Sequence, residues 1–140
     1  MIHMMIWVKN NGGDVQVGVF VNHTNHPFGH WSDEQMEAAR QYGEVIDVNF
    51  PAVEAGWDEA AVDSLARENA RCILAMQPSA VLVQGEFTYS YALISYLLKA
   101  GADVLAACSE RCTECFVNEQ QETIRRSVYK FVRFRSYKTV

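Results

Sequence analysis

Three short polar segments contain the side chains of this sequence that are best suited to bind or activate a small ligand. Each follows a run of residues typical of a buried β-strand. The segments are Asn22-His23-Thr24, Gly85-Glu86-Phe87-Thr88-Tyr89-Ser90 and Ser109-Glu110-Arg111. Together they offer a titratable imidazole, hydroxyl and amide groups, a backbone open to close approach and a guanidinium, which are groups for proton transfer and anion binding.

Each segment suggests a specific chemistry, and each also has a purely structural explanation. The imidazole of His23 titrates nearest to neutral pH, so His23 is the candidate general acid or base. Gly85 allows a ligand to approach the backbone, and the N–H groups of the helix that follows favour an anion. Arg111 provides a fixed positive charge that suits phosphate. Alternatively, Gly85 only makes a turn, Ser109 only caps, and Arg111 only pairs with a neighbouring carboxylate.

Alternating apolar runs and amphipathic stretches must position these segments. The expected strands are Val15–Val21, Glu44–Phe50, Ala80–Gln84 and Asp103–Cys108, and the expected helices run from Ser32 to about Tyr42, from Asp58 to about Met76 and from Glu86 to Ala100. Ser32 and Gln35 form a capping box at the first helix. This alternation predicts βαβ crossovers and a parallel sheet, for which we expect the strand order 2-1-3-4. The switch point then lies between the first and third strands, and ligands bind beyond the carboxyl ends of such strands.

Both ends of the sequence depart from this pattern. Residues 112–137 predict antiparallel strands around a polar turn at Asn118–Glu122. In the last strand, alternation places Phe131, Arg133 and Arg135 on one face, where they would hold phosphates and stack bases, or would only protect a charged sheet edge. Residues 1–14 predict an extra edge strand with a turn at residues 11–14, or a flexible segment. The predicted fold is one α/β domain over residues 1–140, an open and mainly parallel sheet with helices on both faces and a C-terminal antiparallel β extension.

Charge and hydropathy limit the possible partners. The formal net charge is −5, of which residues 1–110 contribute −9 and residues 111–140 contribute +4. A chain this acidic is not expected to bind long nucleic acid, because that affinity grows with the number of phosphates neutralised, but a compact anion remains possible. No apolar run approaches the ~18 residues of a membrane span, and we expect no signal peptide. A cytoplasmic location with reduced cysteine thiols is therefore expected.

A metal site is the main alternative to an anion site. The sequence contains two groups of potential ligands, each with its members close together. One group is Cys108, Cys112 and Cys115, and the other is His23, His26 and His30. Structural zinc sites usually pair two knuckles, whereas this sequence has a single CxxC motif, whose two cysteines would face opposite sides of a strand. We therefore expect no tightly bound metal and no cofactor. A zinc-stabilised interaction module without a nucleotide remains the competing hypothesis.

The order and spacing of four motifs resemble a known group of proteins. These motifs are Asn22-His23, Gly85-Glu86-Phe87-Thr88, Ser109-Glu110-Arg111 and the ending Lys130-Phe131-Val132-Arg133-Phe134-Arg135-Ser136-Tyr137. Over residues 15–137 the sequence resembles the small stand-alone CRISPR-associated proteins of type III systems, the ring nucleases, which are related to Rossmann-like sensor domains for cyclic oligoadenylates. Residues 1–14 and the cysteines lie outside this resemblance.

The resemblance implies a Rossmann-like homodimer that binds a cyclic oligoadenylate, most simply the tetra-adenylate, on its two-fold axis. For several members it also implies metal-independent cleavage of the ring, in which a ribose 2′-OH attacks the adjacent 3′-phosphate and leaves a 2′,3′-cyclic phosphate. Carried over to this sequence, His23 would move a proton, and Ser109 and Arg111 would contact the scissile phosphate. The remaining pocket residues would be Asn22, Thr24, Gly85, Glu86 and Thr88, with Arg133 and Arg135 less directly involved. A non-catalytic protein that sequesters the same ligand would use the same residues.

Overall fold

The structure, a computed structural model, describes residues 7–10, 13–16 and 18–140 of the chain. The strands are β1 (Trp7–Asn10), β2 (Gly13–Gln16), β3 (Val19–Thr24), β4 (Glu44–Asp47), β5 (Ala80–Gln84), β6 (Val104–Val117) and β7 (Thr123–Ser136). The α-helices are α1 (Asp33–Arg40), α2 (Glu59–Ala75) and α3 (Phe87–Lys99), and a short 3-10 helix spans Phe28–His30. No helix within these described ranges is long and apolar enough to cross a lipid bilayer.

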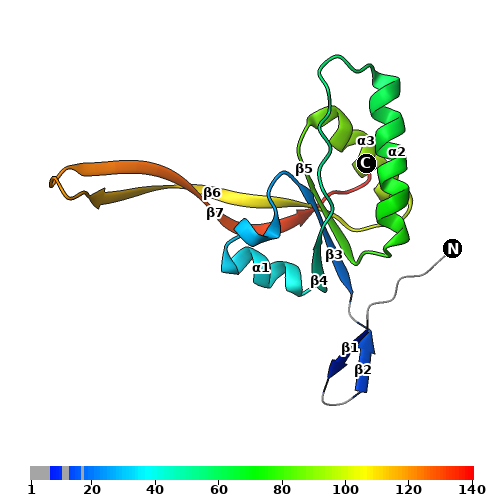
Figure 1. The fold of residues 1–140 in the computed structure, drawn as a ribbon, viewed down its shortest axis with the longest axis horizontal. Coiled ribbons are helices and arrows are strands. Elements are labelled where there is room, and N and C mark those ends of the chain that lie inside the picture. Colours follow the sequence, from blue (N-terminus) through cyan, green and yellow to red (C-terminus); the bar gives the residue numbers. More distant parts are fainter. Residues whose placement is uncertain (1–6, 11–12, 17) are drawn as a thin grey trace.

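Five strands form the main sheet in the order β4-β3-β5-β6-β7 (Figure 1). Strand β3 pairs in parallel with β4 and β5, and β5 pairs in parallel with β6, whereas β7 runs antiparallel to β6. Counted along the predicted strands this is the order 2-1-3-4, so the predicted order and switch point are confirmed. The fold is therefore mixed α/β, with a mostly parallel sheet and a C-terminal antiparallel pair.

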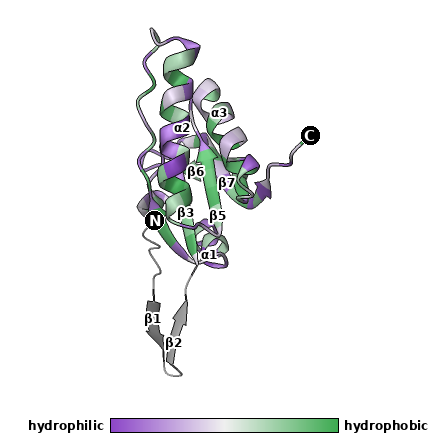
Figure 2. Cartoon of the chain, turned by 90° about the vertical axis from the view of Figure 1, so that its right-hand side faces the viewer, coloured by the Kyte–Doolittle hydropathy of each residue, from purple (hydrophilic) through white to green (hydrophobic). Residues whose placement is uncertain are grey.

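Helices cover both faces of this sheet because the buried strands carry apolar residues on both faces. On one face, α2 and α3 enclose a core with Val19, Val21, Val81 and Val83. On the other face, α1 packs near Phe20, Leu82, Leu105 and Phe134. Figure 2 shows the hydrophobic residues concentrated on the central strands β3 and β5. Alternation along each strand therefore decides which face a side chain joins.

The N-terminal part of the chain differs from the prediction. The predicted first strand Val15–Val21 is wrong in its start, because Val15 and Gln16 belong to β2 and the core strand begins at Val19. Strands β1 and β2 pair with each other as a separate antiparallel hairpin, not as an edge of the main sheet. Two residues of the predicted turn, 11 and 12, lie outside the described residues.

Two other strand boundaries also differ. Strand β4 ends at Asp47 rather than Phe50, since the Val48 carbonyl turns to the His23 ring and Phe50 turns into the core. The predicted fourth strand Asp103–Cys108 is much longer, because β6 continues without interruption to Val117. No glycine or proline interrupts this stretch, so nothing in it stops the strand. Beyond the sheet, β6 and β7 form a two-stranded arm, residues 109–131, that projects from the domain (Figure 1).

The arm closes at the predicted turn, where Asn118 Oδ1 accepts hydrogen bonds from the backbone of Gln120 and Glu122. At its base the register shifts, because Cys108 lies opposite Arg133 while Ser109 lies opposite Phe131. Val132 is thus the extra residue of a β-bulge. The bulge corrects the predicted faces of the last strand. Phe131 shares a face with Phe134, at 4.9 Å between ring centroids, and not with Arg133 and Arg135.

Candidate functional site

His23 lies inside the protein and not at its surface. It is fully buried, and its ring points to the α2 and α3 side of the sheet between Phe50 and Tyr89. Nδ1 lies 2.8 Å from the Val48 carbonyl oxygen, which can only accept, so Nδ1 carries the proton. Nε2 lies 2.7 Å from the Tyr89 hydroxyl, and this hydroxyl also accepts a hydrogen bond of 2.8 Å from Asn69. Both ring nitrogens therefore form hydrogen bonds within the protein, which indicates a structural role for His23.

His23, Tyr89 and Asn69 form a hydrogen-bonded relay, and the charge states of His23 and Tyr89 are consistent with each other. Burial lowers the pKa of His23 below its ordinary value of 6.5, and the hydrogen bond to Val48 opposes this only in part. Burial likewise raises the pKa of the Tyr89 phenol, while Asn69 works against the rise. A neutral imidazole that accepts a hydrogen bond from a neutral phenol requires no buried charge. The position argues against contact between His23 and a ligand in the solvent.

A pH dependence of stability follows from the lowered pKa of His23. Near neutral pH both folded and unfolded chains carry a neutral imidazole, so the contribution is complete. As the pH falls below about 6.5, the unfolded chain takes up a proton that the folded chain refuses, and the free energy of unfolding decreases by up to about 1.4 kcal/mol per pH unit. Urea unfolding between pH 7.5 and about 5 measures this slope. His23→Gln should reduce it, whereas the exposed-site control His26→Gln should keep it; equal slopes in the parent and His23→Gln contradict the assignment.

Asn22 and Thr24 point to the opposite face and organise the loop after β3. The side-chain amide of Asn22 donates to Asp47 Oδ1 at 2.8 Å and to the His26 carbonyl at 2.9 Å. The Thr24 hydroxyl donates to Asn22 Oδ1 at 2.9 Å, and the indole N–H of Trp31 also reaches the His26 carbonyl. Asn22 is buried, so it acts as a brace that fixes the loop and not as a ligand contact.

The N-terminus of α3, which the sequence predicts to bind an anion, is already capped by a carboxylate of the chain itself. Glu86 is the N-cap of α3, and its carboxylate accepts hydrogen bonds from the backbone N–H groups of Tyr89 at 2.7 Å and Thr88 at 3.1 Å. The Thr88 hydroxyl donates to the same carboxylate. The Tyr89 N–H above all, and also Thr88, keep the pKa of Glu86 below its usual value, while partial desolvation opposes this.

Gly85 allows a close approach, but to a side chain of the protein. A Cβ atom added at Gly85 would lie 2.2 Å from Cζ of Phe50. The ring of Phe50 in turn contacts Tyr89 edge-on, with centroids 5.2 Å apart. The segment from Gly85 to Thr88 therefore packs and caps the start of α3, in contrast to its predicted role in ligand binding.

A cleft lies on the α1 face, at the carboxyl ends of β3 and β5 and beside the base of the arm. Its volume is about 800 Å³. The lining residues come from the loop after β3, from α1 and from the strands, and they include Thr24, His26, His30, Trp31, Gln84, Ser109, Tyr129 and Phe131. The predicted crevice beyond the strand ends thus exists, and of the predicted site residues it brings together Thr24 and Ser109.

Arg111 lies just outside the cleft on the arm. It is two residues beyond Ser109 on the same strand and directly opposite Tyr129, so the three side chains share one face of the arm. Its Nε and one terminal nitrogen donate to the Ser127 hydroxyl at 3.1 and 3.0 Å. Within the described part of the chain, no carboxylate forms an ion pair with Arg111. The guanidinium is therefore placed at the rim with charge that no neighbouring carboxylate neutralises.

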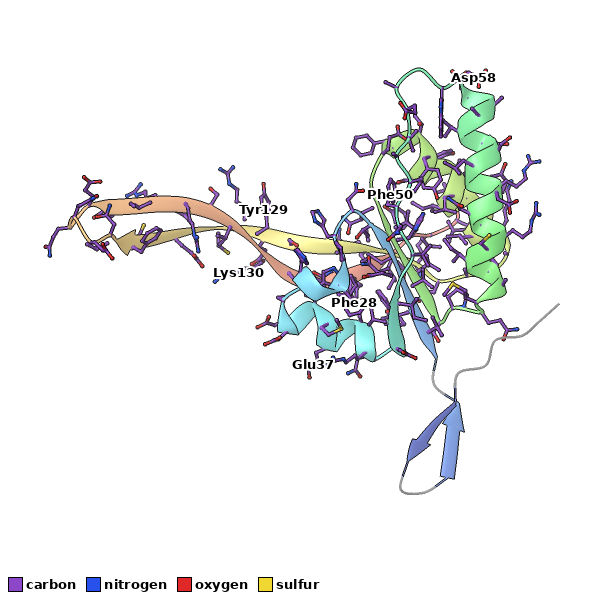
Figure 3. The ribbon with its side chains drawn as sticks, viewed as in Figure 1. Phe28, Glu37, Phe50, Asp58, Tyr129 and Lys130 are labelled. Carbon is purple, nitrogen blue, oxygen red and sulfur yellow. The ribbon has the colours of Figure 1, made fainter. Side chains whose placement is uncertain are left out.

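The structure separates the other predicted residues from this cleft. Arg133 and Arg135 alternate with buried Phe134, so they face the opposite side of the sheet. Lys130 lines the cleft in part, but its ammonium pairs with Glu114 at 4.0 Å, and Figure 3 shows Tyr129 and Lys130 on opposite sides of the arm. Among the described residues, no three His, Cys, Asp or Glu side chains are grouped so as to hold a metal ion.

Sequence reasoning missed most of the residues that line the cleft. The sequence pattern suggests His26 and His30 only as metal ligands, yet both are exposed at the cleft, and it gives no signal for Trp31 and Tyr129, which also line it. One signal was available, because strict alternation along Asn22-His23-Thr24 places His23 on the face opposite to its neighbours. The imidazoles at the cleft had to come from the loop that follows.

Comparison with known proteins yields one relationship. A family model described as the Uncharacterized protein MJ1673 family matches residues 18–135. No curated protein matches the chain, and no solved structure matches it. The matched range begins just before β3 and ends within β7, so it covers the sheet, the helices, the cleft and the arm.

Proposed function

The chain belongs to the uncharacterized protein MJ1673 family, and for this member we propose that the cleft on the α1 face binds a cyclic oligoadenylate and that the protein cleaves the ring without a metal. The proposal combines the resemblance of four sequence motifs to ring nucleases with the composition of the cleft. The strand order 2-1-3-4 is also the basis on which we propose a Rossmann-like relationship.

The observation that carries the proposal is the combination of aromatic rings and hydrogen-bond donors around one cleft. Trp31, Tyr129 and Phe131 line it together with His26 and His30. Aromatic faces stack on bases without demanding a particular sequence, and imidazole, hydroxyl and guanidinium groups bind phosphate oxygens. A volume of about 800 Å³ lies within the usual range of ligand sites. A short nucleotide ligand satisfies both kinds of lining residue at once.

The proposed reaction needs little machinery from the protein. A ribose 2′-OH gives up its proton to a base as its oxygen attacks the phosphorus of the adjacent 3′-phosphodiester, the bond to the 5′-oxygen of the next nucleotide breaks, and that oxygen takes up a proton. The products carry a 2′,3′-cyclic phosphate and a 5′-hydroxyl. Because His23 is buried, the proton carriers in this proposal are His26 and His30, while Ser109 and Arg111 stabilise charge on the phosphate.

A second candidate function is sequestration of the same ligand without cleavage. Two observations favour it, because the imidazole expected to move a proton is enclosed in the core and the helix N-terminus expected to bind phosphate is capped by Glu86. Binding would then use the aromatic residues of the cleft in the same way. Only the chemical step distinguishes the two functions.

We expect the purified protein to bind labelled cyclic tetra-adenylate and to convert it to linear products at the same rate with and without EDTA. Tyr129→Ala should weaken binding roughly 10-fold, since base stacking on an aromatic ring contributes about 1–3 kcal/mol. Tyr129 is 72% exposed, so its truncation should leave folding intact. Equilibrium binding and single-turnover cleavage measure both steps.

The matched control is Phe116→Ala, an aromatic residue of the same arm that is 44% exposed and lies on its other face. It should bind the ligand like the parent protein. Binding without cleavage selects the sequestering function, whereas absence of binding, or equal losses in Tyr129→Ala and Phe116→Ala, contradicts the proposed cleft.

A further inference from the structure

The two faces of the arm differ in the side chains that they carry. Side chains alternate between the faces along each strand, and the regular register beyond the bulge places paired residues on the same face. Figure 3 shows this alternation at Tyr129 and Lys130. The face that continues from the cleft, here called the Ser109 face, includes Ser109, Arg111, Thr113, Arg125, Ser127 and Tyr129. The charged residues of the other face, here called the Glu110 face, are Glu110, Glu114, Arg126 and Lys130.

The charges of the Glu110 face are balanced within the arm. The Glu114 carboxylate pairs with Arg126 at 3.3 Å and with Lys130 at 4.0 Å. The Arg126 guanidinium also lies over the ring of Phe116, at 5.7 Å from its centroid. Glu110 lies directly opposite Lys130, so acidic and basic side chains are interspersed along this face. The Glu110 face therefore needs no external partner for its charges.

The two arginines of the Ser109 face have no carboxylate beside them. The Arg111 guanidinium donates to the Ser127 hydroxyl, and the Arg125 side chain forms no hydrogen bond or ion pair within the described part of the chain. The arm has four basic and four acidic residues, so it has no excess charge as a whole. Its acidic residues lie on the Glu110 face or around the turn, and they are Glu110, Glu114, Glu119 and Glu122. The positive charge of the Ser109 face thus comes from an uneven distribution over the two faces, and it favours an anionic partner.

The Ser109 face combines this charge with an aromatic ring and hydroxyl groups. Tyr129 is 72% exposed, lines the cleft and lies directly opposite Arg111. The next pair outward, Thr113 and Ser127, carries two hydroxyls, and Arg125 follows one pair further along. From Ser109 to the level of Arg125 the face covers six residues of β6, or about 20 Å at the usual rise of a strand. Aromatic rings interleaved with cations are typical of surfaces that bind single-stranded nucleic acid, whereas an acidic peptide requires the cations alone.

We propose that the Ser109 face binds a short, linear, single-stranded oligonucleotide that runs from the cleft along the arm to Arg125. Its phosphates pair with Arg111 and Arg125, and a base stacks on Tyr129. The carboxylates around the turn repel further phosphates, so the bound segment ends there. This inference goes beyond the proposed function, because it requires neither a cyclic ligand nor cleavage. A small ring is confined to the cleft, whereas a linear strand extends onto the arm.

Fluorescence anisotropy with labelled linear oligoadenylates of increasing length tests the extent of the site. Affinity should rise from about four to about eight nucleotides and then level off, because the arm is filled. Arg125→Gln should weaken binding of the longer strand about 5-fold, and it should reduce the slope of log affinity against log salt by about 0.7, the value for one phosphate contact.

The matched control is Arg126→Gln, which removes the same charge from the adjacent residue on the Glu110 face. It should bind the longer strand like the parent protein, and neither substitution should alter the affinity for the shortest strand. Both side chains are exposed, so folding should be unaffected. Equal losses in the two variants, or an affinity that does not depend on strand length, would overturn the proposal.

Alkylation of cysteine by iodoacetamide locates the bound strand directly. Cys115 is exposed and lies opposite Arg125 on the Ser109 face, so a saturating strand of about eight nucleotides should slow its alkylation several-fold. Cys72 is exposed on α2 and should react at the same rate with and without the strand. A polyglutamate peptide of equal charge should protect Cys115 much less. Equal protection by the peptide would show an acidic-peptide site, and unprotected Cys115 would show that the strand does not reach Arg125; either result contradicts the proposal.

The same measurements separate this inference from the proposed function. Binding of cyclic tetra-adenylate without length-dependent binding of linear strands refutes the role of the arm and leaves the proposed function standing. Length-dependent, Arg125-dependent binding of linear strands without binding of the ring supports the role of the arm and refutes the proposed function.

Discussion

Replacing His23 by alanine should lower the free energy of unfolding by about 3–4 kcal/mol. The substitution leaves a cavity between Phe50 and Tyr89. It also removes the hydrogen-bond acceptor of the Tyr89 hydroxyl and the hydrogen-bond donor to the Val48 carbonyl. Cavity formation and lost buried hydrogen bonds together reach this size. Urea unfolding at neutral pH measures the change. A loss below about 1 kcal/mol would show that the relay does not support the core.

Tyr89→Phe is the matched control because it removes only the hydroxyl that links His23 to Asn69. It should cost about 1–2 kcal/mol, since buried His23 and half-buried Asn69 lose one partner each. The pH dependence should persist in Tyr89→Phe, which keeps the imidazole, and disappear in His23→Ala. If His23 were a surface acid or base, its replacement would instead slow ring cleavage in a protein of normal stability.

Gly85→Ala should destabilise the protein by about 1–3 kcal/mol, the usual cost of inserting one methyl group into a packed site. The new Cβ would meet three ring carbons of Phe50 at 2.2–2.6 Å. The ring cannot move freely, because it packs against both His23 and Tyr89. Thermal or urea unfolding measures the loss, and ligand affinity should not change, since Gly85 does not line the cleft.

The double variant Gly85→Ala/Phe50→Leu separates packing from ligand binding. A smaller side chain at residue 50 makes room for the new methyl group, so the double variant should lose less stability than the two single variants combined, by about 1 kcal/mol. Strict additivity would show that Phe50 is not the neighbour that matters. Normal stability with weakened ligand binding in Gly85→Ala would restore the role that the sequence suggested.

The sequence predicted the arrangement of the sheet well because that arrangement depends on local signals. The N-cap at Ser32, whose side chain accepts from the Gln35 N–H, and the order of the central strands were confirmed. Apolar runs separated by amphipathic stretches identify the strands and helices, and right-handed crossovers leave few orders for the strands. The cap at Glu86 was also within reach, since an acidic residue before a helix competes with any external anion.

The site was harder to predict, because its geometry depends on pairs of residues far apart in the sequence. Gly85 next to a predicted helix looks the same whether a phosphate or the ring of Phe50 approaches it. The polar segment Ser109 to Arg111 predicts a strand end, but β6 continues through it because two-stranded ribbons tolerate polar residues on both faces. A bulge leaves no signature in the sequence here.

The bulge at Val132 determines which face of the arm each residue beyond it joins. Every residue from Phe131 outward lies on the face opposite to the one that simple counting from Phe134 assigns. The arm can therefore lengthen or shorten by residue pairs across its two strands without disturbing the base of the cleft. A change of one residue between Tyr129 and Val132 would exchange the faces and turn Tyr129 away from Ser109. Insertions in this arm should thus be tolerated when they add equal numbers of residues to both strands. The unpaired residue of the bulge at the base of the arm imposes this rule.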